Sequence, residues 1–397
     1  MNVLIAFDKF KDSMSAKTAC VVAANTLNQH HPAWSTLGTP LTDGGEGFCE
    51  IMTEAVSGRF HQLPVLGPRF REQSALLGFA DLARVPDAAR RRLDLPSEGN
   101  LAIVEMAQAT GMEGMRPEER NCLETTSFGT GELMAFAIEQ GADALLLGIG
   151  GSATSDLGLG ALEALGLQFR DREDRPITRI TPARWPEIHH LAGNLFHPGR
   201  EGLPPIRIAC DVTNPLLGPR GAAAVYGPQK GLPKDQLPYM EAEGERLALM
   251  LLRYFEKPDD LLTMPGAGAA GGIGFGLVTA ANARLVSGFD LVADWLQLQE
   301  HVQQADLILT GEGRFDESSL QGKGPFAILE MANAAGDKSV HVLAGKVEVD
   351  NLQHLRGRFA GFSARAIARP DWDLDRNLAE GPALLKQSIE SLLAEIS

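Results

Sequence analysis

Hydrophobic and polar positions along the first 41 residues predict a strand, a helix and a second strand. Val3 to Ala6 is a short apolar run, typical of a buried parallel strand. Ser15 is suited to cap a helix, because apolar residues then recur at helical spacing. Thr36 to Leu41 is the next predicted strand. Since strand–helix–strand units build parallel sheets, we expect the polar residues that follow these strands to gather at one sheet edge.

The C-terminal part of the chain repeats this alternation. Asp306 to Thr310 and Val340 to Leu343 are predicted strands, and Pro325 to Ala335 is a predicted helix between them. The centre has a different pattern, with two polar segments at Asp81 to Asn100 and Asp171 to Gly202. The two ends therefore predict one domain and the centre another.

We accordingly predict an α/β fold of two domains. Residues 1–60 and 300–397 form a discontinuous Rossmann-like domain around a parallel sheet, and residues 61–299 form a second α/β domain inserted into it. Further strands are expected at Leu101 to Met106, Ala144 to Ile149 and Ile206 to Cys210, with a helix at Thr126 to Gln140.

Composition and charge exclude several classes of protein. The 36 Lys and Arg against 51 Asp and Glu leave a formal charge of −15, which disfavours binding to nucleic acid or to an anionic membrane surface. The uncharged stretch from Leu261 to Ala283 is rich in glycine, so it predicts a buried loop and helix instead of a membrane span. Four cysteines without a CxxC pattern and an early charged N-terminus predict a cytoplasmic protein. The oligomeric state is left open.

Two glycine-rich segments match the pattern G-x-G-x-x-G/A. The first follows a predicted strand and runs from Gly148 to Asp156; its hydroxyls, Ser152 and Thr154, suit phosphate oxygens. The second begins at Gly266 and precedes a predicted helix, whose first N–H groups favour an anion. A phosphate cradle, a structural turn and a dinucleotide fold all remain open for the first segment. Close helix packing is the alternative for the second.

Carboxylates and lysines also stand at the expected sheet edges. Carboxylates at or just after predicted strand ends are Asp8, Asp43, Glu46, Asp211, Glu312 and Asp316. Mg²⁺ prefers one or two carboxylates plus substrate phosphates, so most of the six cannot be its ligands. Lysines beside these polar segments are Lys9, Lys11, Lys230 and Lys323. No P-loop, protein-kinase, GxSxG or HExxH signature is present.

These same residues resemble the bacterial glycerate kinases of type 1. The matching segments are FDKFKDSMSA, DGGEG, VEMAQATGM, TTSFGTGEL, GIGGSATSDLGLGALEALG, ACDVTNPLLGPRGAAAVYGPQKG, PGAGAAGG and LTGEGRFDESSLQGKGP. They run from Phe7 to Pro325 in the family's order. The chain departs from the family at Phe7-Asp8-Lys9 and at Ser155 to Gly158, so Lys9 has no family support whereas Lys11 has.

The resemblance implies phosphorylation of glycerate by ATP with Mg²⁺, with 2-phosphoglycerate favoured over 3-phosphoglycerate. Phosphoryl transfer needs positioning, neutralised charge and a group that orients the attacking hydroxyl. The expected catalytic residues are Asp211 or Asp43 as base, and Lys11. The expected glycerate-binding residues are Lys230, Arg314 and Asp8, and the expected metal ligands are Glu312 and Asp316. The expected ATP-binding residues are Gly150, Gly151, Ser152, Thr154, Gly266, Gly268 and Lys323.

Two other functions fit part of the sequence. A nicotinamide-dependent oxidoreductase explains both glycine patterns but leaves the carboxylates unexplained. A sugar-acid binding protein without catalysis uses the same residues without ATP. Release of ADP in the presence of glycerate separates the three hypotheses.

Overall fold

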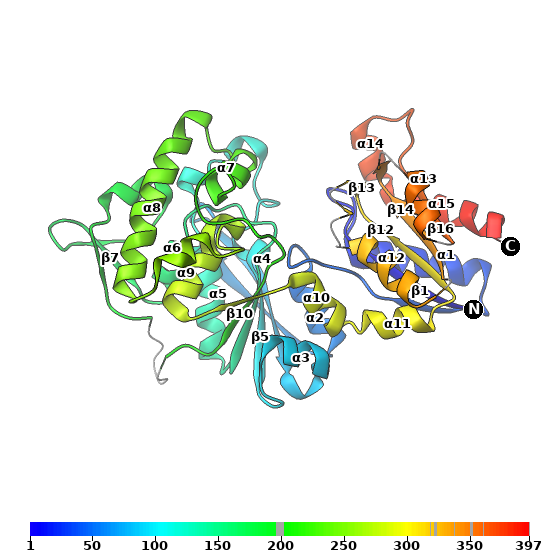
Figure 1. Cartoon of the computed structure of the whole chain (residues 1–397), viewed down its shortest axis with the longest axis horizontal. Helices are drawn as coiled ribbons and strands as arrows, with labels where there is room; N and C mark the ends of the chain where they lie inside the picture. Colours follow the sequence, from blue (N-terminus) through cyan, green and yellow to red (C-terminus); the bar gives the residue numbers. More distant parts are fainter. Residues whose placement is uncertain are drawn as a thin grey trace. The chain divides into compact units, whose positions relative to one another are not determined.

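The computed structural model describes residues 1–195, 202–317, 319–320, 324–336, 338–349, 352–359 and 361–396. The chain divides into two compact units, which we call unit 1 (residues 1–43 and 292–397) and unit 2 (residues 44–291). Unit 1 therefore contains both ends of the colour scale in Figure 1 and unit 2 contains its middle. The boundaries predicted from sequence, after residue 60 and before residue 300, lie 17 and eight residues further along the chain.

Unit 1 is built on a parallel sheet with the strand order β16-β14-β12-β1-β2. The strands of this sheet are β1 (Asn2–Phe7), β2 (Ser35–Gly38), β12 (Leu307–Gly311), β14 (Ser339–Ala344) and β16 (Phe362–Ala366). β1 pairs with β12 from Val3 opposite Leu307 to Phe7 opposite Gly311. The prediction that these two distant segments share one sheet is confirmed.

Helices cover both faces of this sheet (Figure 1). On one face, α1 and α15 pack on apolar residues of β1 and β12, with Ser15 capping α1 through its hydroxyl. On the other face, α12 contacts β1, β12 and β14. The helices and remaining short strands of unit 1 are α1 (Ala16–His30), α11 (Leu298–Gln304), β13 (Arg314–Asp316), α12 (Gly324–Ala334), β15 (Lys346–Glu348), α13 (Leu352–Arg358), α14 (Leu374–Ala379) and α15 (Gly381–Ile396).

Unit 2 is built on a mixed sheet with the order β11-β10-β6-β5-β4-β3. Its strands are β3 (Arg59–Leu66), β4 (Glu72–Asp81), β5 (Asn100–Glu105), β6 (Ala144–Gly148), β10 (Ile206–Ala209) and β11 (Arg284–Val286). β5, β6, β10 and β11 are parallel, whereas β4 is antiparallel to both β3 and β5. The carboxyl ends of β5, β6 and β10 therefore lie next to one another.

The helices of unit 2 bury the apolar faces of that sheet. Their bounds are α2 (Phe48–Ala55), α3 (Asp87–Leu93), α4 (Met106–Thr110), α5 (Phe128–Glu139), α6 (Leu159–Ala164), α7 (Ala222–Tyr226), α8 (Leu237–Tyr254) and α9 (Ile273–Ala281). Residues of α5, α6, α8 and α9 share one core with β4, β5, β6 and β10. Because α2 contacts β4 and β5, the chain joins unit 2 earlier than the sequence boundary at residue 60. The last connection is α10 (Gly288–Trp295), within which the chain passes from unit 2 to unit 1.

Two segments with an unusual composition, the polar one from Asp171 and the uncharged one from Leu261, form regular elements of unit 2. The polar segment from Asp171 to Gly202 contributes the strands β8 (Pro176–Ile177) and β9 (His190–Ala192) to a small sheet, in which both pair with β7 (Gln168–Arg170). Residues 196–201 of this segment lie outside the described part. The uncharged stretch from Leu261 contains short turns and then α9, as predicted. Among the described residues, no helix is both long enough and apolar enough to span a membrane.

Candidate active site

Unit 1 brings three of the predicted carboxylates together at the carboxyl ends of its strands. Asp8 follows β1, Asp43 follows β2 and Glu312 follows β12. β1 lies between the other two strands in the sheet, so the parallel arrangement converges on one edge as expected. The backbone N–H of Lys9 donates to the Asp8 carboxylate at 2.6 Å. One oxygen of Glu312 is buried and has no hydrogen-bond partner among the described residues.

The electrostatics of this acidic cluster (Asp8, Asp43 and Glu312) oppose full ionisation. Burial, reinforced by the negative charge of Asp43, raises the pKa of Asp8 to about 7. Burial also raises the pKa of Glu312 to about 7, with smaller contributions from Asp316 and Asp43. Desolvation and like charges both penalise a carboxylate. A cation at this edge would relieve the repulsion.

The other predicted residues of unit 1 lie near the cluster but have different surroundings. Lys11 is exposed in the loop after β1, and its backbone lies close to Gly313. The Arg314 guanidinium pairs with Asp316, Nε to Oδ2 at 3.0 Å, and also with Glu348. Asp316 and Arg314 thus neutralise each other, which weakens the case for either as a direct ligand. Lys323 lies outside the described residues.

In unit 2, the loop after β6 packs against the loop that begins unit 2. The backbone N–H of Gly150 donates to the carbonyl of Gly44 at 2.8 Å. A Cβ at Gly150 would come within 2.5 Å of the Gly45 Cα, and a Cβ at Gly151, whose φ is +69°, would overlap the Glu46 carboxylate. These glycines are required for close packing between two loops. The structural interpretation of this loop is therefore supported for Gly150 and Gly151, and the phosphate-cradle interpretation stays open.

Lys230 lies beneath the same loop. Its ammonium group is buried and donates to the Ser152 hydroxyl at 2.8 Å and to the Thr154 carbonyl at 2.6 Å. Burial lowers the pKa of Lys230 to about 8. Asp156, also buried, accepts hydrogen bonds from both the N–H and the hydroxyl of Ser127. Lys230 therefore holds the glycine-rich loop from inside, and the Thr154 hydroxyl is buried without a hydrogen-bond partner among the described residues.

The second glycine-rich segment also serves packing. Gly266 has a φ of +88°, and a Cβ there would come within 2.8 Å of Leu285. A Cβ at Gly268 would overlap the carbonyl oxygen of Pro215. The segment precedes α9, as its sequence predicts, and no strand directly precedes it. Its glycines allow chain segments to approach closely, which was the alternative interpretation.

Asp211 follows β10, and both of its carboxylate oxygens accept hydrogen bonds. Oδ1 accepts from the Ser287 hydroxyl at 3.2 Å and from the Gly288 N–H at 2.8 Å, and Oδ2 accepts from the Phe289 N–H at 2.9 Å. Gly288 and Phe289 are the first two residues of α10, and Ser287 directly precedes it. These contacts leave the oxygens of Asp211 less available to a substrate than those of a solvent-facing carboxylate.

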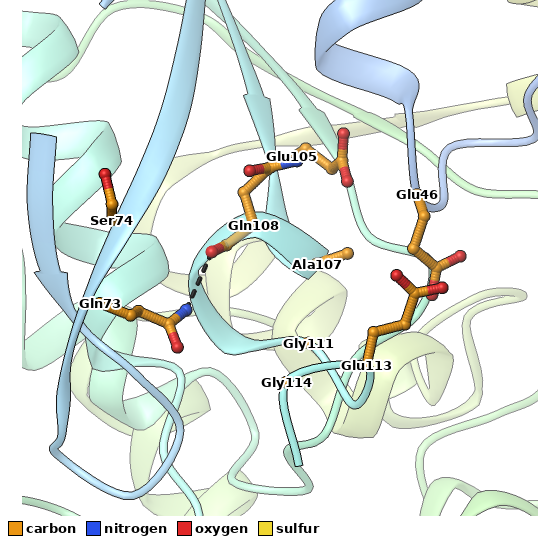
Figure 2. A pocket seen from close by; sticks show the side chains of 9 residues that line it. All are labelled: Glu46, Gln73, Ser74, Glu105, Ala107, Gln108, Gly111, Glu113 and Gly114. Carbon is orange, nitrogen blue, oxygen red and sulfur yellow. Dashed lines mark hydrogen bonds between the residues drawn. The ribbon is translucent and has the colours of Figure 1, made fainter. Parts of the chain in front are cut away.

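Unit 2 contains a polar pocket of about 270 Å³ (Figure 2). Its lining residues are Glu46, Gln73, Ser74, Glu105, Ala107, Gln108, Gly111, Glu113 and Gly114. Gly111 of this lining forms a β-bridge with Ser152 of the glycine-rich loop. The Gln73 amide donates to the Gln108 carbonyl at 2.9 Å. Three carboxylates on the lining repel an anion, so the pocket favours groups that donate O–H or N–H hydrogen bonds.

Sequence reasoning missed most of these lining residues. Glu105 stands at the end of an apolar strand, so the strand-end pattern that selected Asp8 and Asp211 would have found it. Gln73 is the second residue of β4, and Gln108 lies on the short helix α4. No sequence pattern distinguishes these two glutamines from surface residues. Their convergence is a product of tertiary packing.

Comparison with known proteins indicates the same family as the sequence segments quoted in the sequence analysis. The model of the glycerate kinase family matches residues 3–397. Glycerate kinase from Haemophilus influenzae is 36% identical over 350 residues, which cover 88% of this chain and 87% of that protein. Glycerate 2-kinase from Escherichia coli (strain K12) is 35% identical, with 91% and 90% covered.

The fold is shared as well. The crystal structure of a protein assigned as glycerate kinase 2 from Salmonella typhimurium LT2 superposes with a TM-score of 0.76 at 32% identity, covering 100% of this chain and 98% of that one. The fold and the sequence thus define a phosphotransferase of the kinase class. The chain belongs to the glycerate kinase family, and that membership implies glycerate and ATP as substrates.

Proposed function

We propose that this enzyme transfers the γ-phosphoryl group of ATP to the 2-hydroxyl of glycerate, giving 2-phosphoglycerate and ADP, as a member of the type 1 subgroup. The observation that carries the proposal is the acidic cluster of Asp8, Asp43 and Glu312 at one sheet edge of a glycerate kinase family member. The 2-position is supported by the name of the Escherichia coli relative, a glycerate 2-kinase. The four cysteines, which form no disulfide among the described residues, support a reducing compartment, the cytoplasm.

Asp43 is the proposed base. Of the two candidates, Asp211 already accepts three hydrogen bonds from residues 287–289, whereas Asp43 is exposed at the edge of the acidic cluster. A base that accepts the hydroxyl proton must be reachable by substrate. Lys11, exposed in the same unit, is the proposed cation for the reacting phosphoryl group. Arg314 stays the proposed partner of the glycerate carboxylate, which would compete for its guanidinium with Asp316 and Glu348.

The residues of unit 1 also fit a magnesium ion. Among the described residues no three His, Cys, Asp or Glu side chains form a closed metal site, but Mg²⁺ bound with ATP needs only one or two carboxylates. Glu312, whose buried oxygen lacks a hydrogen bond, is the proposed ligand, and Asp8 is its neighbour in the cluster. Asp316, expected beside it, is paired with Arg314. When bound, Mg²⁺ neutralises charge on the phosphates.

The nucleotide is proposed to bind along the loop after β6. Gly151, Ser152 and Thr154 remain the proposed phosphate contacts, with Lys230 supplying positive charge beneath them. Gly150 and the second glycine-rich segment then support the loop through packing.

A coupled assay for ADP with glycerate as the varied substrate tests the activity, and phosphorus NMR of the product distinguishes the 2-phosphate from the 3-phosphate. We expect ADP release that depends on glycerate, and a 2-phosphate signal. In Asp43→Asn, kcat should fall by roughly 10²-fold or more, with a smaller change in KM. Turnover of a nicotinamide cofactor without ATP and without coupling enzymes, or glycerate binding without ADP release, would instead support one of the two rival functions.

A further inference from the structure

The chain passes between the units at two places, and the first is fastened to the glycine-rich loop. The crossing lies between Asp43 and Gly44. The Gly44 carbonyl accepts the hydrogen bond from Gly150, and a Cβ at Gly44 would lie 3.3 Å from the Ala209 carbonyl oxygen. The first residue of unit 2 is therefore seated at the ends of β6 and β10.

A buried carboxylate holds the helix that follows this crossing. Glu105, at the end of β5, is only 1% exposed. Its Oε1 accepts from the backbone N–H of Gly47 at 3.3 Å and its Oε2 from the N–H of Cys49 at 3.0 Å. These N–H groups are at the N-terminus of α2, where intrahelical partners are missing and a negative charge is favoured. Glu105 thus fixes the start of α2 to the sheet.

The second crossing is held in the same way. The chain leaves unit 2 between Leu291 and Val292, inside α10. Asp211 accepts the N–H groups of Gly288 and Phe289 in the first turn of that helix. Hydrogen bonds from backbone N–H groups to a carboxylate are about twice as strong as neutral ones. Asp211 therefore fixes the start of α10 to the end of β10.

Both carboxylates flank the strand that leads into the glycine-rich loop. In the order β10-β6-β5, Gly148 pairs with Ala209 on one side and with Glu105 on the other. Asp211 lies two residues beyond Ala209. The two crossings and the proposed nucleotide loop are thus attached to three adjacent strand ends.

We propose that Glu105 and Asp211 are positioning residues that fix the direction in which the chain leaves unit 2 at both crossings. The inference rests on the proposed function, because phosphoryl transfer requires groups aligned to within about 1 Å. Hinges are commonly a few residues at the ends of elements, and here both element ends are tied to the edge that carries the glycine-rich loop. In this role Asp211 acts through α10 and does not touch the reacting atoms.

The first test measures the distance between the units without any substrate. Spin labels are placed on two exposed alanines, Ala242→Cys in α8 and Ala394→Cys in α15, in a Cys210→Ser background. Pulsed electron paramagnetic resonance then gives the distribution of distances. Glu105→Gln and Asp211→Asn each replace an acceptor oxygen with an N–H₂ group that faces a backbone N–H. We expect each variant to broaden the distribution, and the double variant to broaden it further.

Glu163→Gln is the matched control. Glu163, on α6, also accepts two backbone hydrogen bonds, from Arg179 at 2.8 Å and Ile180 at 3.0 Å, far along the chain from either crossing. Its distribution should match that of the parent. Ser287→Ala removes the hydroxyl hydrogen bond to Asp211 and keeps those from the Gly288 and Phe289 N–H groups, so this milder variant should broaden the distribution less. Distributions in the Glu105 and Asp211 variants that match the control would overturn the proposal.

Steady-state kinetics of Asp211→Asn distinguish a positioning role of Asp211 from a direct catalytic role. We expect Asp211→Asn to lower kcat about tenfold while the KM values for ATP and glycerate change by less than about threefold. Loss of turnover with an unchanged distance distribution would make Asp211 a catalytic residue and overturn the inference. If the unaltered protein released no ADP with glycerate, the proposed function would fail, and the distance measurement would still decide the role of the two carboxylates.

Discussion

The ammonium group of Lys230 donates a hydrogen bond to the Ser152 hydroxyl at 2.8 Å, in a position that leaves Lys230 only 3% exposed. A lysine that is buried in this way holds the protein loop in place through hydrogen bonds, in addition to any contact with a ligand. The same ammonium group also binds the Thr154 carbonyl, so the loop after β6 is built around a buried amine. This contact has a consequence for the pH dependence of stability.

Stability should rise with pH above 8 because of Lys230. Burial lowers its pKa in the folded chain from 10.5 to about 8, so between these values the unfolded chain binds the additional proton. The free energy of unfolding then increases by up to about 1.4 kcal/mol per pH unit. Urea unfolding at pH 7 to 9.5 should show this gain relative to Lys230→Met. Parallel pH profiles for the two proteins would contradict it.

Gly150→Ala should destabilise unit 2. The new Cβ would meet the Gly45 backbone at 2.5 to 2.7 Å, and backbone cannot move aside as a side-chain tip can. The expected loss is about 1–3 kcal/mol, measured from the urea midpoint, together with a raised KM for ATP. Gly357→Ala is the control, since nothing lies within 4 Å of its Cβ and it stands in helix α13. If the urea midpoint of Gly150→Ala equalled that of Gly357→Ala, the two loops would be able to move apart at little cost, and the prediction would be wrong.

Asp8→Asn should stabilise the protein while it impairs turnover. At pH 8 the Asp8 carboxylate is charged despite its burial and the nearby charge of Asp43. Removing that charge should raise the free energy of unfolding by about 2 kcal/mol. Millimolar Mg²⁺ should stabilise the unaltered protein more than the variant. Asp12 is exposed in the same loop, so Asp12→Asn should leave the free energy of unfolding and its increase with Mg²⁺ unchanged. Equal stabilisation by Mg²⁺ in all three proteins would remove Asp8 from the proposed metal environment.

His341 should weaken the fold under acid conditions. Burial lowers its pKa from 6.5 to about 4, and its ring lies between the hydroxyls of Ser339 and Ser363. As pH falls from 6.5 to 4, the unfolded chain takes up a proton that the folded chain excludes, so up to about 3 kcal/mol of stability is lost. His341→Asn should flatten this decline, whereas exposed His354→Asn should not. Thermal unfolding across that pH range provides the measurement.

The sheet of unit 1 could be predicted because its strands are short apolar runs with polar ends. Val3 to Ala6 and Asp306 to Thr310 carry enough β-branched and apolar residues to be assigned, and the parallel rule then joins them. The unit boundary could not be placed as well. Nothing in the Gly44 to Gly47 segment shows that the helix after it packs on β4 and β5.

The candidate site could be predicted in its residue types but less well in their roles. Asp8, Asp43 and Glu312 were selected as strand-end carboxylates, and they converge. Asp211 is predicted by the same strand-end pattern and Lys230 as a lysine beside a polar segment, yet their contacts are with α10 and with Ser152. A sequence shows that a charged residue stands at a strand end. Whether its partner is a ligand or a distant backbone N–H depends on the packing of segments such as 287–289.

The pairing of β1 with β12 has a consequence for synthesis on the ribosome. The Thr310 hydroxyl bonds to the Ala6 carbonyl across a separation of 304 residues. At ribosomal rates, β1 waits roughly 15–60 s before its partner strand is made. Unit 2, which is continuous and has its own core, completes its chain during that interval. While unit 2 forms, β1 can pair with β2 but lacks β12 on its other side. That unpaired edge of an apolar strand is the part of the nascent chain that a chaperone would protect.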